Sequence, residues 1–175
     1  ILLSSLGIFS QNQISKKDKE IYYLLLDELE SGSVEKGLKL ADSTYNRAIK
    51  EGNKVLEKLM LNILAVANAQ EGSFTASKKT LLKGHNLISN LDDSYLKDSL
   101  VIENLHLQGH NYLDYGEFQK AIEKFNQALN TSQKRKINKL TSISYNWLGN
   151  AYAMHELYDD AIFYYNECIK YDIPV

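Results

Sequence analysis

Glu103, His106 and His110 are the residues of this sequence whose types and spacing could hold a metal ion. Spacings of three and four residues place their side chains on one face of a helix, with Asp114 one turn further on. Two histidines four residues apart can ligate zinc, as in the zinc metalloprotease motif, where a glutamate follows the first histidine. Leu107 occupies that position here. We therefore favour a polar binding surface at these residues and keep metal binding as the alternative.

Nothing else in the sequence indicates catalysis or a cofactor. There is no nucleophile with a paired base and no glycine-rich phosphate loop. Cys168 is the only cysteine, which excludes an internal disulfide and a thiolate zinc site. The net charge of −2 argues against a nucleic-acid partner, because nucleic-acid-binding domains are usually basic. We expect a non-enzymatic protein that uses no cofactor.

The elements that must position these side chains are helix hairpins that repeat along the chain. The first helices of the last two hairpins carry the same face forty residues apart: Leu105, Gly109 and Tyr112, then Tyr145, Gly149 and Tyr152. The second helices repeat in the same way: Phe118, Ala121, Ile122, Phe125, Ala128 and Leu129, then Tyr158, Ala161, Ile162, Tyr165, Cys168 and Ile169. Such self-similarity is typical of a helical repeat array. The glycines on the first helices would let neighbouring helices approach closely and bury each other's rings.

Turn residues divide the whole chain at the same period. Gly32, Gly72, Gly116 and Glu156 mark the turns within successive hairpins, at spacings of 40, 44 and 40 residues. The only proline is Pro174, so the helices can run without kinks. The predicted hairpins span about residues 15–51, 53–91, 94–134 and 136–171. Short loops make neighbouring helices antiparallel.

The last hairpin resembles a tetratricopeptide repeat. That family's pattern places Leu-Gly and then Tyr on the first helix, followed by Ala and an aromatic residue on the second. Matching residues here are Leu148, Gly149, Tyr152, Ala161 and Tyr165. The period near forty exceeds the usual period of about 34 and resembles the long-period arrays of bacterial sensor and regulator proteins. The resemblance implies an all-α fold, a right-handed α-solenoid of four antiparallel hairpins, as a single domain over residues 15–175.

The resemblance also implies a concave groove, lined by the first helices, that binds a protein or peptide. In that geometry the residues facing the groove are Tyr22, Asn62, Val66, Glu103, His106, His110, Asn146 and Asn150. Amide side chains both donate and accept, which suits an extended peptide backbone. The family also has a version that clamps a C-terminal carboxylate with basic residues. Those basic positions hold Asn146, His106 and Glu103 here, so we do not expect that function.

The leading hypothesis is thus a protein-interaction or peptide-binding module. The alternative is the N-terminal sensory part of a larger bacterial signalling protein, a histidine kinase or a helix-turn-helix transcription regulator. Residues 1–14 begin with an apolar run, ILLSSLGIFS, that resembles the tail of a signal peptide and indicates an exported, periplasmic or membrane-anchored protein. The alternatives are an N-terminal extension packed on the first hairpin and a cytoplasmic protein. The run is too short to span a bilayer.

The last predicted helix carries an apolar face on which no further predicted helix would pack. End repeats need a polar outer face for solubility, and the helix up to Tyr171 carries apolar residues on the side where another repeat would pack. We therefore predict that this end pairs with another copy or with further sequence.

Overall fold

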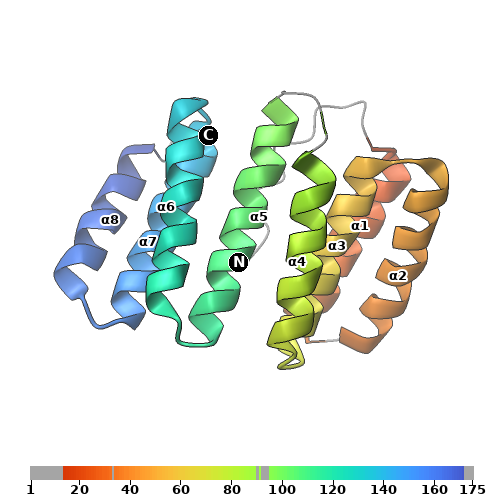
Figure 1. Ribbon diagram of the computed structural model, residues 1–175, viewed down its shortest axis with the longest axis horizontal. Helices are drawn as coiled ribbons and strands as arrows, with labels where there is room; N and C mark the ends of the chain where they lie inside the picture. Colours follow the sequence, from red (N-terminus) through yellow and green to blue (C-terminus); the bar gives the residue numbers. More distant parts are fainter. Residues whose placement is uncertain (1–13, 33, 90, 92–94, 172–175) are drawn as a thin grey trace. The chain divides into compact units, whose positions relative to one another are not determined.

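The computed structural model describes residues 14–32, 34–89, 91 and 95–171, and over these residues the chain is all α (Figure 1). The apolar run at residues 1–10 lies outside them. The described part contains eight helices: α1 (Lys16–Glu30), α2 (Val34–Glu51), α3 (Lys54–Gln70), α4 (Phe74–Ser89), α5 (Tyr95–Asp114), α6 (Phe118–Lys134), α7 (Asn138–Met154) and α8 (Tyr158–Tyr171). The predicted fold class, an all-α array of four helix hairpins, is confirmed.

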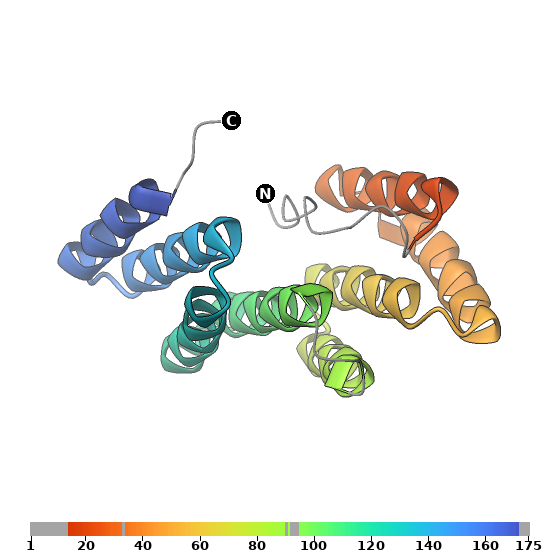
Figure 2. The same ribbon diagram turned by 90° about the horizontal axis from the view of Figure 1, so that it is seen from above.

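The described helices form two compact units, one with α1–α4 and one with α5–α8. Within each unit every helix packs on its neighbours in the chain. The first helices of the two hairpins also contact each other, α1 with α3 and α5 with α7. Figure 2 shows the two hairpins of each unit lying next to one another. In each unit, therefore, the second hairpin packs directly against the first in chain order.

Left-handed residues close the hairpins at the predicted period. The backbone angle φ is +78° at Gly32, +75° at Gly72, +71° at Gly116 and +63° at Glu156. The residue after each of the last three donates its backbone N–H to a carbonyl five residues earlier, as in Asn68, Tyr112 and Tyr152. This is the hydrogen bond of a Schellman helix end, which favours glycine because a Cβ is disfavoured at positive φ. Glu156 adopts the same conformation without being glycine, so the repeat position predicts that turn better than the residue type does.

The closest approach within a hairpin occurs where glycine faces an aromatic ring. A Cβ added to Gly149 would lie 2.5 Å from the ring of Tyr165, and one added to Gly109 would overlap the ring of Phe125. Phe125 is fully buried, and it forms a core with residues of α5, α6 and α7. The predicted close approach of the helices at Gly109 and Gly149 is confirmed. It sets the distance between α5 and α6, and between α7 and α8.

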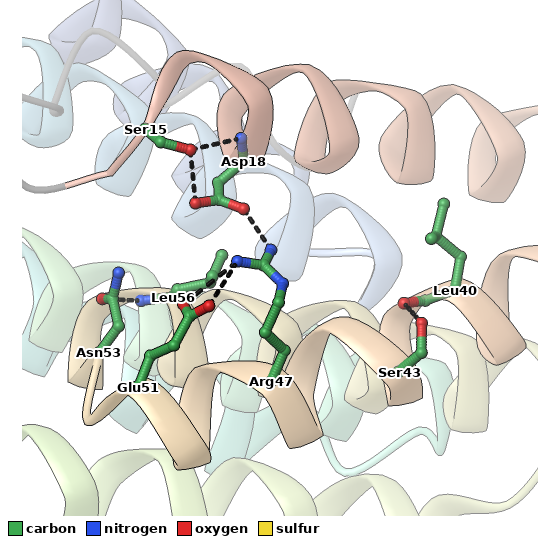
Figure 3. Close-up of polar contacts among 8 residues, drawn as sticks. All are labelled: Ser15, Asp18, Leu40, Ser43, Arg47, Glu51, Asn53 and Leu56. Atoms are coloured by element: carbon green, nitrogen blue, oxygen red, sulfur yellow. Dashed lines mark hydrogen bonds and ion pairs between the residues drawn. The ribbon is translucent and has the colours of Figure 1, made fainter.

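In the first unit, polar contacts hold the start of α1 against α2 (Figure 3). Ser15 caps α1, accepting a hydrogen bond from the Asp18 backbone N–H at 3.1 Å and donating to the Asp18 carboxylate at 2.6 Å. The buried Asp18 side chain also pairs with Arg47 of α2, which contacts Glu51 as well. Burial alone would raise the pKa of Asp18, but the hydrogen bonds from Ser15 and Arg47 and the charge of Arg47 lower it below 3.8. The contact therefore stabilises the charged carboxylate.

Candidate functional site

The predicted groove residues divide into a buried set and a half-exposed set. The buried ones are Tyr22, Asn62, Val66, Glu103 and His106, and none is more than 8% exposed. The half-exposed ones are His110, Asn146 and Asn150. A ligand can reach only side chains that meet solvent, so the second set defines where a binding site can lie. Of these three residues, His110 and Asn150 line one cleft and Asn146 does not.

The cleft lies in the second unit and encloses about 250 Å³. Its walls come from α5, α7 and α8, and the lining residues are His110, Leu113, Asp114, Trp147, Asn150, Ala153, Met154 and Tyr165. The contact between α5 and α7 brings the two first helices together. Because Gly149 of α7 has no side chain, the ring of Tyr165 of α8 can lie close to α7. The cleft is thus a product of the hairpin stacking.

Trp147 forms the rigid apolar wall of this cleft. Its indole ring stacks on Phe125 with ring centroids 5.7 Å apart and an interplanar angle of 11°. The imidazole ring of His110 meets it edge to face, with centroids 5.1 Å apart and an angle of 87°. Rings held on two sides lose little further freedom when a ligand packs against them, which favours binding. Met154, 52% exposed, adds a flexible apolar side chain to the same cleft.

Two polar contacts set the polar groups of the cleft. His110 Nδ1 lies 3.2 Å from the Asp114 carboxylate, which places an imidazole and a carboxylate side by side in the cleft wall. The Tyr165 hydroxyl donates to Asn150 Oδ1 at 2.8 Å, which leaves the Asn150 amide hydrogens for another acceptor. The cleft therefore presents donors and acceptors beside an aromatic wall.

His106 lies one turn before His110 but is part of the core. The Ser144 hydroxyl donates to the Leu140 carbonyl at 2.7 Å, so His106 must donate from Nε2 to the Ser144 oxygen, at 2.8 Å. Burial lowers the pKa of His106 from 6.5 to about 3. The ring is consequently neutral and committed to a hydrogen bond inside the protein.

The structure gives the metal-binding alternative no support. Within the described residues, no group of three or more histidine, cysteine, aspartate or glutamate side chains is placed to hold a metal ion. Glu103 and His106 are buried, whereas His110 faces the cleft and contacts Asp114. Spacing on one helix face was therefore insufficient, because the three side chains differ in burial and are not placed around one point.

Sequence reasoning missed Trp147 and Tyr165 as site residues. Trp147 lies three residues before Asn150 and seven before Met154, which places the three on one helix face and could have revealed it. Tyr165 fits the core pattern of its helix, and nothing in its spacing indicates that its hydroxyl reaches Asn150.

The fold and the cleft define the class of this chain as an all-α protein of stacked helix hairpins. The chain matches no protein-family model, and no curated protein was found to be similar to it. No helix within the described residues has the length and apolar character needed to cross a bilayer.

Proposed function

We propose that the chain is a tetratricopeptide-like interaction module that binds a peptide segment of a partner protein in the cleft of the second unit. The observation that carries the proposal is the convergence of Trp147, His110 and Asn150 on one open cleft. Tryptophan is enriched among the residues that dominate binding energy at protein interfaces. Here it lies next to groups that can donate to, or accept from, a peptide backbone.

The size of the cleft favours a peptide over a compact small molecule. Pockets that enclose drug-sized ligands usually measure about 300–1,000 Å³. This cleft is smaller, at about 250 Å³, and open to solvent. It suits one anchoring side chain of an extended segment, with the rest of the segment lying on the surface. An apolar or aromatic anchor would pack against Trp147 and Met154, while the Asn150 amide donates to a backbone carbonyl.

The cleft contains its own reporter, because Trp147 is the only tryptophan in the chain. Peptides would be selected from a displayed random library against the purified chain. Synthetic versions would then be titrated while the fluorescence of Trp147 is followed. We expect a saturable change in intensity or wavelength, and selected peptides that share an apolar or aromatic position.

Asn150→Ala tests whether the cleft is responsible. It should weaken binding of the selected peptides about 5- to 30-fold, because one hydrogen bond worth about 1–2 kcal/mol is lost. The matched control is Asn130→Ala, an exposed asparagine of α6 outside the cleft. Peptides that bind without changing Trp147 fluorescence, or that bind both variants equally, would refute the proposed site.

A further inference from the structure

The outer face of α8 carries apolar residues at repeat positions whose equivalents on α6 are buried. Ile162 and Ile169 stand forty residues after Ile122 and Leu129 of α6. Ile122 and Leu129 are 6% and 7% exposed, and α7 packs on their helix. Ile162 and Ile169 are 58% and 67% exposed. Among the residues that the structure describes, therefore, no helix covers Ile162 and Ile169 as α7 covers Ile122 and Leu129.

Three of the four large apolar residues that are exposed on α8 lie on one line of the helix with the half-buried Tyr165, and the fourth, Phe163, lies off it. On that line Tyr158, Ile162, Tyr165 and Ile169 are separated by four, three and four residues. That alternation keeps side chains along one line of a helix and is the pattern by which two helices interlock. Tyr158 is 63% exposed, and Tyr165 is half-buried beside α7. A long helix laid along this line would cover all four residues.

The charges beside the seam indicate which helix fits. Asp159 and Lys170 lie on the same flank, at opposite ends of α8. A second α8 running antiparallel would place Asp159 of each copy near Lys170 of the other, where it joins the exposed ion pair that Lys170 forms with Glu167 of its own helix. A parallel two-fold pair would place Asp159 of the two copies on opposite edges of the seam and so form no such contacts. Antiparallel pairing also brings opposite ends of the two helix dipoles together.

We propose that α8 pairs with α8 of a second copy of this chain, antiparallel and about a two-fold axis. The same face is then buried on both copies, as in any isologous dimer. The seam of Tyr158, Ile162, Tyr165 and Ile169 forms its centre, and Asp159 and Lys170 form its rim. The partner helix takes the place on α8 that α7 takes on α6. Tyr165 also lines the cleft, but the dimer requires no peptide to be bound there.

The test is the mass of the purified chain in solution at tens of micromolar protein, measured by light scattering and sedimentation. We expect twice the monomer mass. Ile162→Lys should reduce the mass to that of the monomer while the helix content measured by circular dichroism stays unchanged, because Ile162 is exposed. The matched control is Ile49→Lys, at an isoleucine of α2 that is 45% exposed, and it should remain dimeric.

A charge exchange tests the orientation. Asp159→Lys alone should weaken the dimer through repulsion by Lys170 of the other copy, and the double variant with Lys170→Asp should restore it. A monomeric wild-type chain overturns the proposal and leaves the face to a different partner. So does a dimer that survives Ile162→Lys, or a double variant that stays monomeric.

Discussion

Lowering the pH should destabilise the second unit through His106. The unfolded chain binds a proton at this side chain below a pKa of about 6.5, whereas the buried ring binds one only below about 3. The unfolded state therefore holds more protons at every pH between these two values. Stability is complete above about pH 6.5 and is lost as the pH falls toward 3.

The size of the effect follows from the pKa difference. Each pH unit below about 6.5 removes about 1.4 kcal/mol from the free energy of unfolding. At about pH 5 the loss reaches about 2 kcal/mol, a large share of the stability of a small folded unit. The cause is the burial of the ring, since desolvation disfavours its charged form.

The assay is urea unfolding followed by the fluorescence of Trp147, which lies in the same unit, at about pH 7.5 and about pH 5. Wild type should lose about 2 kcal/mol more than His106→Gln across this range, because the variant has no ring to protonate in the unfolded state. Ser144→Ala removes the hydrogen bond but keeps His106 buried, so it should retain the wild-type pH dependence. Equal pH dependence of wild type and His106→Gln would refute the reasoning.

Two further predictions concern packing and an ion pair, both measured by urea unfolding. Gly149→Ala should lower the free energy of unfolding by about 1–3 kcal/mol, because its Cβ would meet the Tyr165 ring. Gly37→Ala, where the nearest atoms lie at 3.6 Å or beyond, should instead leave it unchanged or raise it by up to about 1 kcal/mol through helix propensity. Arg47→Ala should cost about 1–3 kcal/mol at neutral pH by leaving Asp18 buried beside Ser15 alone. That cost should shrink as the pH falls below 3.8 and on through the lowered pKa of Asp18, where the carboxylate becomes protonated; a cost that persists at still lower pH would contradict the ion-pair account.

The fold was predictable because its signals are local and recur. Gly116 and Glu156 hold the same left-handed turn forty residues apart, although only one is a glycine. Gly109 faces Phe125, and Gly149 faces Tyr165, across equivalent helix pairs. Each signal involves residues within one hairpin, so a pattern along the chain contains both partners of the contact.

The site was less predictable because burial depends on a helix elsewhere in the chain. His106 and His110 share a helix face, and spacing alone treats them alike. Ser144 of α7 hydrogen-bonds one of them inside the core, while the other meets Trp147 at the edge of the cleft. The depth of a residue between two first helices is set by how closely those helices pack. That distance is a property of all the side chains between them.

The exposed face of α8 also depends on a helix that lies outside its own hairpin. Ile162 and Ile169 have the same repeat positions as Ile122 and Leu129, but the first pair is exposed and the second is buried. The residue types therefore indicate that another helix should pack on this face, but they do not identify that helix. If this face packed on a different surface of a second copy, each added copy would leave another such face open, and the assembly would continue as a filament unless it closed into a ring. Pairing of the face with itself closes after two copies. In such an antiparallel pair, Asp159 of each copy lies near Lys170 of the other, so opposite charges meet on both sides of the closed dimer.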